Sequence, residues 1–562
     1  MKKRGLKFNK TLILVLSLII VLELVLLGFN YNSTGNIVKK FADDIIGAKT
    51  SNFQTPSPST QATAKATVPT TPTTTTRVNP QTQNSLGELV TKEGVVELMI
   101  IDNFKEPQLS KEVYYLNDNG KRYELSTDKH LPVKSKIKVT GYLKDNKISF
   151  SDTNSNLRGT SYSVASANVE PWPKTLGEQK YVVVYLLNEA DKNNFDAENF
   201  TNITFGLVNN WIKDASYGKA NIHVDFGGSY IYDNFSNCDY SDYVNIAINK
   251  SDQDTNFSKY DGIIVYSSTN DCFKWYSGMA AIGKNFYLTN EGIVNIYSLW
   301  INHYWQHYYD NEYPNSFNTL VHEFGHNFGL MHAKEILVIE KYHTYYEYGD
   351  FFDVMGFSSF YGDYGVFSKK ILGWNDNNIA EVEEGIFFIT PLEKKLINPS
   401  EIHGIKIPIN YNISIMNLTP VHSGDYNLNL LSNYYVEYRG YNNYSNKNLL
   451  DRPPTEERFK HGLLIRLGQN EINNFENIGT FLINTHSSFS EHFQSPWPLI
   501  FKNETYFDSF NNMSISVLDM NDSGALIEVT KQPTCTDSDG GYNYNMKGIV
   551  TYQGVSYTDY CV

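Results

Sequence analysis

Three histidines and a glutamate stand within eleven residues of this chain, in the stretch HEFGHNFGLMH that runs from His322 to His332. The apolar residues around them predict a helix, on which His322 and His326 lie one turn apart on the same face. At that separation both imidazoles can bind one zinc ion, and Glu323 beside the first can take a proton from a water on that zinc. The stretch therefore predicts a zinc site with its own general base.

Gly329 indicates how a third ligand reaches the same ion. A helix continued to residue 332 would carry His332 away from the site, whereas a glycine can take the left-handed conformation that ends a helix. The turn would bring His332 back, so that zinc has three protein ligands and one position open to water, as a catalytic zinc requires. The alternative is a helix that carries polar residues on one side without a metal.

The motif HExxHxxGxxH that begins at His322 resembles the signature of the metzincin zinc metallopeptidases. Metzincins also have a tight turn with a methionine beneath the zinc, and Met355 in DVMGFSS matches it. The phrases YDGIIVYSS, YGD…VMG, FSKKILGW, YYVEYRGY and HGLLIRL look specifically like the gametolysin (autolysin) family. This resemblance covers about residues 181–530.

The resemblance implies one catalytic zinc ion with three ligands: His322, His326 and His332. It also implies that Glu323 acts as general base and acid and that Met355 lies beneath the zinc. It also implies an edge strand that pairs with an extended substrate, expected within residues 278–288. Astacin-like metzincins have a tyrosine two residues after the methionine, where this chain has Phe357. Matrix-type metzincins are kept latent by a cysteine on zinc, but no cysteine precedes Cys238 here.

Other metal sites have weaker signals. His303 and His307 also stand four residues apart, and a second metal is conceivable there, but no carboxylate is placed as Glu323 is. A solvated loop near the cleft is the alternative. No ladder of calcium ligands is present, so Ca²⁺ is possible but unsupported.

Hydrophobic patterns predict the elements that would position the site. Continuous apolar runs at 181–187 and 260–268 predict buried strands, and residues 196–218 have the spacing of an amphipathic helix. Alternating patterns after Gly373 predict an all-β region, and those at 86–151 predict a small antiparallel β domain with an OB-like barrel. That small domain could bind a ligand, act as a spacer or be a pro-region.

The predicted fold class is multidomain α/β plus all-β, with a metzincin-like catalytic domain between an N-terminal small β (OB-like) domain and a C-terminal β-sandwich domain. The predicted segments are a signal anchor or signal peptide at 1–29, a Thr/Pro-rich stalk at 30–85, the small β domain at 86–155, the zinc peptidase domain at 176–380, the β-sandwich domain at 381–531 and a Cys-closed hairpin at 532–562.

Charge, the N-terminus and the cysteines bear on location and partners. The net charge of −14 argues against nucleic acid as a partner. Five cations within the first ten residues precede the apolar run 11–28, which predicts a membrane anchor or a cleaved secretory signal. Either would place the rest of the chain outside the cytoplasm.

The four cysteines fall into two local pairs that form disulfides or remain free thiols: Cys238 with Cys272, and Cys535 with Cys561.

The sequence therefore predicts an extracytoplasmic zinc-dependent endopeptidase that hydrolyses peptide bonds of surface or cell-wall proteins. Its expected partners are a protein or peptide substrate and the membrane that its N-terminal helix enters; the oligomeric state does not follow from the sequence. Two alternatives stay open. One is a surface adhesion protein whose peptidase domain is inactive, and the other is a zinc hydrolase that cleaves a different amide, such as one linked to a glycan.

Overall fold

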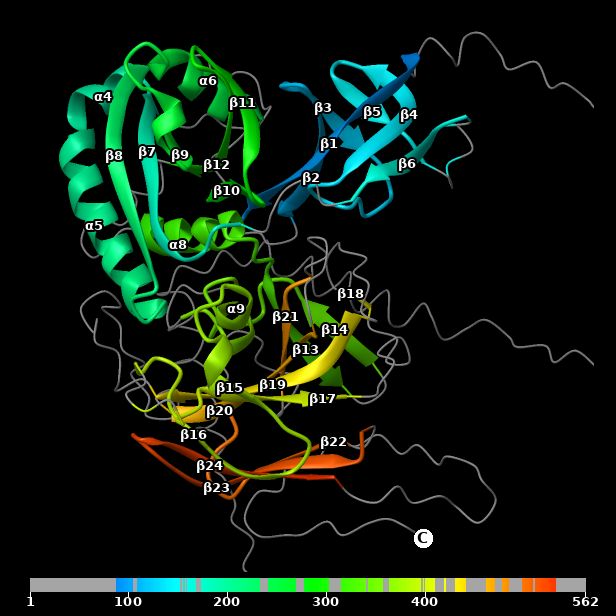
Figure 1. Cartoon of the computed structure of the whole chain (residues 1–562), viewed down its shortest axis with the longest axis vertical. Coiled ribbons are helices and arrows are strands. Elements are labelled where there is room, and N and C mark those ends of the chain that lie inside the picture. The colour runs from blue at the N-terminus through cyan, green and yellow to red at the C-terminus, as the bar shows by residue number, and fades with distance from the viewer. Residues whose placement is uncertain are drawn as a thin grey trace, which may run out of the picture. The chain divides into compact units, whose positions relative to one another are not determined.

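The computed structural model describes residues 87–531 with gaps at 105–108, 152–153, 155–156, 158, 168–172, 233–240, 269–276, 303–314, 340–341, 357–362, 396–397, 399, 410–418, 421–429, 441–460, 471–477, 485–497 and 509–510. Within these residues the strands form three sheets, and the helices are fewer and mostly short (Figure 1). The helices are α4 (Glu189–Asn194), α5 (Ala197–Ala215), α6 (Ser241–Ser251), α8 (Asn315–Asn327) and α9 (Val366–Ile371), with 3-10 turns at Phe257–Lys259 and Asp376–Asn378.

The first sheet has twelve strands in the order β6-β4-β5-β3-β2-β1-β10-β12-β9-β7-β8, with β11 paired to β12. Their bounds are β1 (Glu88–Asp102), β2 (Lys111–Asp118), β3 (Lys121–Ser126), β4 (Lys136–Lys144), β5 (Lys147–Ser149), β6 (Ser161–Ser166), β7 (Gly177–Leu187), β8 (Ala220–Ile231), β9 (Gly262–Ser267), β10 (Gly278–Ala281), β11 (Asn285–Thr289) and β12 (Gly292–Asn302). Strands β8, β7, β9 and β12 are parallel neighbours, and β10 and β1 continue the sheet antiparallel.

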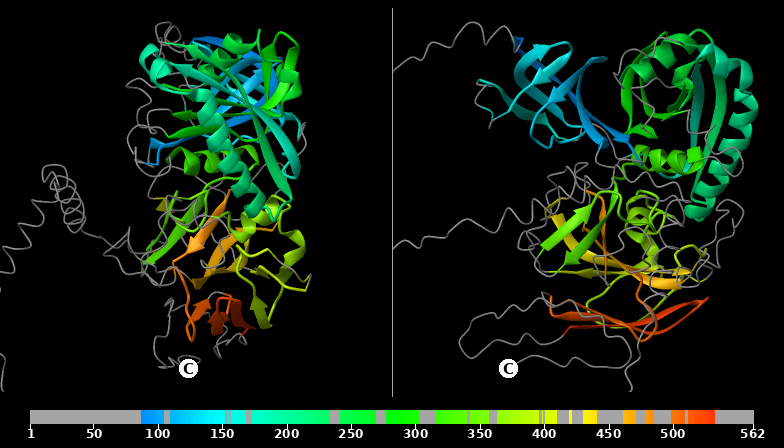
Figure 2. Two further views of the ribbon diagram at one scale, coloured as in Figure 1. Left: turned by 90° about the vertical axis from the view of Figure 1, so that its left-hand side faces the viewer. Right: turned by 180° about the vertical axis from the view of Figure 1, so that it is seen from behind.

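Strand β7 is apolar throughout because helices cover both faces of the sheet around it. Val183 and Tyr185 face a core that includes residues of α5 and α8, whereas Val182 and Val184 face a second core that includes α6. A strand buried on both sides needs no alternation of polar residues, so its sequence is a continuous hydrophobic run. Figure 2 shows the long helix α5 lying along β8 at one end of this sheet.

The remaining strands form an eight-stranded and a four-stranded sheet with a common core. The eight-stranded order is β15 (Ile379–Glu381), β17 (Gly404–Pro408), β19 (Leu431–Gly440), β20 (His461–Gln469), β21 (Thr480–Ile483), β13 (Ala333–Ile339), β14 (Tyr342–Tyr346) and β18 (Thr419–Pro420). The four-stranded order is β16 (Gly385–Ile389), β24 (Gly524–Lys531), β23 (Met513–Asn521) and β22 (Thr505–Asp508). Helix α8 leads directly into β13, so the chain passes from the first sheet to the second beside the histidine motif.

The predicted α/β fold class is wrong for this chain. Strands predominate over the described residues, and an α/β catalytic domain of the metzincin type is not shown, although the β-rich ends agree with the predicted β domains. The buried strands and α5 were placed correctly, but strand pairing between distant segments is not visible in local patterns. Strand β1 joins the same sheet as β7, and the residues after His332 form strands β13 and β14.

Predictions of a membrane anchor and of disulfides need correction. No helix in the described part of the chain is long and apolar enough to cross a bilayer, and the apolar run 11–28 lies outside that part. The membrane-anchored cell-surface location is therefore not supported. No disulfide is seen among the described residues, and Cys238, Cys272, Cys535 and Cys561 all lie outside them. The stalk at 30–85 and the hairpin at 532–562 also lie outside the described residues.

Candidate metal centre

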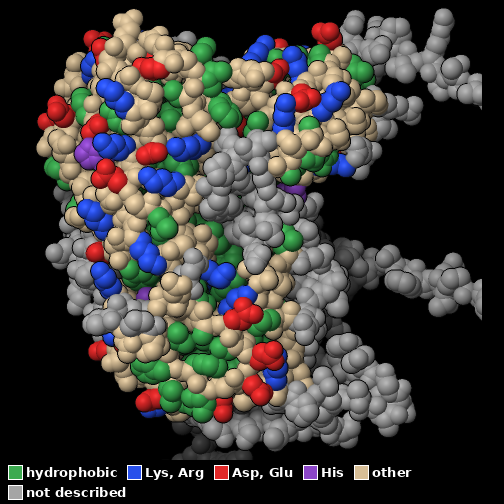
Figure 3. Space-filling model, in the orientation of Figure 1, with side chains coloured by type: hydrophobic (Ala, Val, Ile, Leu, Met, Phe, Trp, Pro, Cys, Tyr) green, Lys and Arg blue, Asp and Glu red, His purple; other side chains and the backbone are tan. Residues whose placement is uncertain are grey.

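Charged side chains are interspersed in sign over the face of the molecule shown in Figure 3, where water solvates them. Buried ionisable groups are more informative, because burial is costly unless a partner compensates the charge. Two buried clusters each include residues of the segment 322–355 together with residues distant in the sequence. The first contains the histidines of the motif, and the second lies in the turn and strands that support them.

Helix α8 positions the first two histidines. Leu320, Phe324 and Phe328 bury its apolar face in the core of the first sheet, which leaves His322 and His326 on a different face. The helix ends as predicted at Gly329, whose φ is 93°. The Gly329 N–H donates to the His326 carbonyl (2.9 Å), and the N–H of the next residue donates to the Gly325 carbonyl (2.9 Å). This pair of bonds is a Schellman motif, and the turn directs the chain back towards the site.

The three histidine rings converge, and a carboxylate that sequence analysis missed lies between them. Asp102, the last residue of β1, has Oδ2 at 3.6 Å from Nε2 of His322 and 3.3 Å from Nε2 of His326. Its Oδ1 lies 2.9 Å from Nε2 of His332. All four side chains are buried, and their ligand atoms lie within 4.8 Å of one another. The four residues form a group that could hold a metal ion.

Each histidine uses Nδ1 for a hydrogen bond that points Nε2 at the common centre. Nδ1 of His322 lies 2.7 Å from the Val354 carbonyl, and Nδ1 of His326 lies 2.8 Å from the Leu330 carbonyl. Carbonyl oxygens only accept hydrogen bonds, so both Nδ1 atoms carry hydrogen and the neutral rings have a lone pair on Nε2. Nδ1 of His332 donates to Glu347 (2.9 Å). Such acceptors behind the rings are typical of metal-binding histidines.

The polar atoms at the centre fit a cation. Among the described residues, Nε2 of His322 and His326 and Oδ2 of Asp102 have no hydrogen-bond partner although all three are buried. Lone pairs and a carboxylate oxygen facing one another repel unless a positive charge lies between them. Ligand atoms of a tetrahedral zinc are separated by about 3.4 Å, which is close to the carboxylate-to-nitrogen distances above. The donor set of nitrogen and carboxylate oxygen is one that zinc accepts.

Without a metal, a proton takes part of that role. Burial lowers the pKa of His322 to about 3, because the charged ring loses its hydration. Burial also opposes the charged form of His332, but the Asp102 charge and the hydrogen bonds to Asp102 and Glu347 outweigh it and raise its pKa to about 9. The Asp102 carboxylate and Glu347 therefore favour a proton on His332, and metal binding would displace that proton.

Glu323 lies beside the centre without a bonding partner. Both carboxylate oxygens are buried and have no hydrogen-bond partner among the described residues. Burial, followed by the negative charge of Asp102, raises its pKa well above the ordinary value for a glutamate. Gly278 of β10 permits this position, because a side chain there would overlap the Glu323 carboxylate. Glu323 is thus a proton acceptor of increased basicity on helix α8, beside the first residue of β10.

Met355 lies under the site helix. Its Sδ packs against Gly325, where any side chain would overlap it. Its carbonyl accepts from the Ala333 N–H (2.8 Å), and its N–H donates to Asp353 (2.9 Å). The residue before it, Val354, supplies the carbonyl that orients His322. The turn at Met355 therefore fixes the first histidine and the start of β13 together.

Tyr348 is a second site residue that sequence analysis missed. Its hydroxyl donates a hydrogen bond to Asp102 Oδ1 (2.5 Å), and its ring centroid lies 4.2 Å from that of His332. The segment predicted as the substrate strand, 278–288, forms β10 and β11 with a break at residues 282–284. His303, His307 and Phe357 lie outside the described residues.

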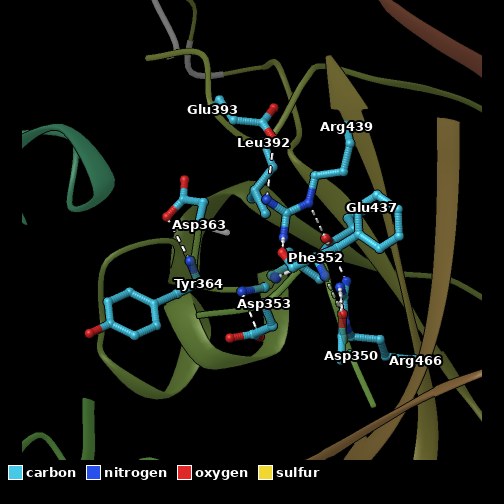
Figure 4. Close-up of polar contacts among 12 residues, drawn as sticks. Asp350, Phe352, Asp353, Asp363, Tyr364, Leu392, Glu393, Glu437, Arg439 and Arg466 are labelled. Carbon is cyan, nitrogen blue, oxygen red and sulfur yellow. Dashed lines mark hydrogen bonds and ion pairs between the residues drawn. The ribbon is translucent and has the colours of Figure 1, made fainter. Parts of the chain in front are cut away.

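The second cluster supports the Met355 turn with opposite charges (Figure 4). Arg466 bonds Asp350 through Nε (2.5 Å) and Nη2 (3.1 Å), and its Nη1 lies 2.5 Å from Glu437. Arg439 bonds the same Glu437 (2.6 Å) and Glu393 (3.1 Å). Burial opposes the ionised form of Glu437, but the charges of Arg439 and Arg466 outweigh it and lower its pKa to about 2.

Asp353 joins this cluster to the turn. Its Oδ1 accepts the Met355 N–H and its Oδ2 accepts the Gly365 N–H (2.8 Å). Burial and the nearby Asp350 charge raise the pKa of Asp353 to about 6. Asp350 in turn accepts the Phe352 N–H (2.9 Å). Backbone donors and arginines hold these carboxylates, so the turn has little freedom to move away from His322.

Comparisons with known proteins add no functional information. No protein-family model matches the chain, and no curated protein matches it. Among solved structures, one chain from an entity described as the structure of a chaperone-substrate complex is similar over 39% of this chain and 29% of its own, with 12% identity and a TM-score of 0.16. This chain thus spans less than a third of that one, and a TM-score of this size carries no argument about fold.

Proposed function

We propose that this protein is a zinc-dependent endopeptidase that uses the metzincin motif, with Glu323 as general base. The observation that carries the proposal is the convergence of three Nε2 atoms on one centre beside an unpaired buried carboxylate. A structural zinc site needs no base beside it. A buried glutamate without a partner is costly, and catalysis is the task that explains its presence.

His322, His326 and His332 would hold the ion, with Val354, Leu330 and Glu347 fixing their rings from behind. A bound zinc would supply Lewis acidity towards a water molecule and a peptide carbonyl. Glu323 would take a proton from the attacking water and return it to the leaving amine, a role for which its raised pKa is suited. Burial of the whole group strengthens these electrostatic effects by excluding bulk water.

Tyr348 is the candidate for stabilising negative charge on the substrate. Its hydroxyl donates to Asp102 Oδ1, an oxygen that lies next to Nε2 of His332. A substrate carbonyl oxygen at that place would receive the same hydrogen bond. Because charge develops on that oxygen in the transition state, the bond would strengthen there. Tyr348 thereby supplies a donor that Phe357 cannot provide.

The proposal is tested with the full chain by zinc analysis and by hydrolysis of casein with and without a chelator. We expect about one zinc per chain. Glu323→Gln should keep the zinc and lower chelator-sensitive hydrolysis at least about a hundredfold, because the proton acceptor is lost. Glu335→Gln is the matched control: Glu335 is a buried glutamate bonded to Asn484 outside the centre.

A chain that binds no zinc would overturn the proposal. So would a Glu323→Gln variant that hydrolyses casein as fast as the Glu335→Gln control. Mass spectrometry of the products identifies the bonds that are cut and distinguishes a peptidase from a hydrolase of other amides.

A further inference from the structure

The four-stranded sheet has two faces in different environments. Ile515, Ile527 and Val529 point into the core that this sheet shares with the eight-stranded sheet. Side chains alternate along a strand, so Leu526 and Glu528 of β24 point to the opposite face. Figure 1 shows this sheet, drawn in orange to red, as the layer beneath β19 and β20. The outer face is the one that points away from the shared core.

Large apolar side chains gather at one edge of the outer face. Ile386 and Phe388 of β16 are 59% and 46% exposed, and Leu518 of β23 is 38% exposed. Leu526 lies between Phe388 and the bulge that contains Leu518. Single exposed apolar residues are ordinary, but a contiguous group on one face marks a surface that binds something. These four residues are called the apolar edge below.

The described chain ends beside the apolar edge. Gly385, the first residue of β16, pairs with Val529, and β24 ends two residues later at Lys531. Lys531 Nζ lies 3.1 Å from Glu383, just ahead of β16. Residues 532–562 continue the chain from this point. At about 3.3 Å per residue, roughly ten residues are enough to run along β16 and return.

The composition of residues 532–562 suits an apolar surface. The segment contains five tyrosines and two short runs in which large residues are separated by one position: Val550 and Tyr552, then Val555 and Tyr557. In an extended conformation each pair shares one face. Two short strands are marginally stable alone and need a surface on which to pack. The segment and the apolar edge would therefore each bury the apolar face of the other.

We propose that residues 532–562 pack on the outer face of the four-stranded sheet and cover the apolar edge. Burial of apolar surface drives the packing, and the tyrosine hydroxyls stay at the border, where water reaches them. Strand β16 is the end strand of this sheet among the described residues, so the cover also keeps other chains from pairing with it.

The direct chain connection favours this segment over a second copy of the protein. A segment tethered a few residues from its binding surface has an effective concentration on the order of millimolar. A second copy reaches that concentration only in very concentrated solution. The packed segment is therefore the occupant that the outer face would acquire first.

Trypsin cleavage after Lys547 in the full chain tests the inference, because a packed segment must leave the sheet before the protease can bind it. Ile386→Asp should raise the initial cleavage rate at least about tenfold, since it places a carboxylate beneath the segment. Ile203→Asp is the matched control: Ile203 on α5 is 57% exposed, and its replacement should leave the rate unchanged. Mass spectrometry of the reduced digest measures the rate.

Phe388→Asp is a second variant in the apolar edge and should change the rate in the same direction. A chain that ends at Lys531 provides a second measurement. It should bind a hydrophobic fluorescent dye at least about twice as strongly as the full chain does, because the apolar edge is uncovered. Adding Ile386→Asp and Phe388→Asp to that shortened chain should remove the increase.

Equal cleavage rates in the wild type and in both variants of the apolar edge would overturn the inference. So would a wild-type rate equal to that of a synthetic peptide with the sequence of residues 532–562. If Ile386→Asp converts a dimer into a monomer in light scattering and leaves cleavage after Lys547 unchanged, a second copy covers the outer face instead, and the inference is wrong. None of these outcomes depends on zinc content or on hydrolysis of casein.

Discussion

The two buried charged clusters of this protein are satisfied in different ways. Around the Met355 turn, Asp350 and Glu437 have arginine partners at hydrogen-bond distance, and Asp353 has backbone donors. At the histidine centre, buried nitrogen and oxygen atoms face one another without such partners. The first arrangement is complete as a structure, whereas the second could hold a cation. Nitrogen lone pairs that face a carboxylate, in place of arginine cations, therefore distinguish the candidate metal site from its support here.

The sharpest test of this comparison removes one histidine from the centre and, in a separate variant, one buried histidine outside both clusters. His326→Ala should abolish binding of stoichiometric zinc and all chelator-sensitive hydrolysis, because two remaining histidines hold zinc weakly. His403→Ala should leave the zinc content at the wild-type value, since His403 is a buried histidine bonded to Asn375 and the Lys394 carbonyl instead. Mass spectrometry of the native protein measures the metal. If His326→Ala retained zinc, the histidine centre would not differ from other buried histidines in its ability to bind metal.

The supporting cluster is expected to respond through stability. Arg466→Met leaves the Asp350 carboxylate buried without its main partner, and the free energy of unfolding should fall by about 3–5 kcal/mol. Chemical denaturation monitored by fluorescence measures the loss. Lys502→Met is the control, because its pair with Asp519 is about half exposed and should contribute nothing measurable. A loss of zinc from folded Arg466→Met, with no change in stability, would show that the cluster belongs to the metal site.

The smallest expected effect concerns Tyr348. Tyr348→Phe should lower kcat about tenfold to a hundredfold and leave KM and zinc content nearly unchanged, because the hydrogen bond strengthens only in the transition state. Steady-state kinetics on one fluorogenic peptide measures both constants. A change confined to KM would assign Tyr348 to substrate binding. Unchanged kinetics would leave the hydroxyl with its bond to Asp102 as its only role.

The sequence predicted the parts of the site that depend on local geometry. His322, His326 and Glu323 share one helix, and Gly329 ends it, so residue spacing alone places them. Asp102 could not be found in this way, because 230 residues separate it from His332 and only the pairing of β1 with β10 brings it there. An acidic residue after the apolar run VVELMII was the single local signal. Tyr348 likewise depends on the path of β14 and the turn after it.

For the fold, too, the sequence predicted the elements that depend on local patterns. Strand β7 and helix α5 follow from a continuous apolar run and from a helical period. The prediction treated residues 86–155 and 381–531 as domains apart from the zinc peptidase domain at 176–380, whereas pairing joins β1 to β10 and β13 to β21. The local sequence pattern of a strand does not indicate which distant strand it pairs with. The domain boundaries remain a prediction.

The link between α8 and β13 limits how the protein can be shortened. His332 is followed at once by β13, which lies parallel to β21, and Gly479 ahead of β21 packs against the His332 carbonyl. A fragment that ends at residue 380 would lack β21. The strand β13 that follows the third histidine would then have lost its parallel neighbour. Recombinant work on a shortened chain should therefore retain residues through Lys531, since a shorter product would lose the geometry of the candidate metal centre for reasons unrelated to its chemistry.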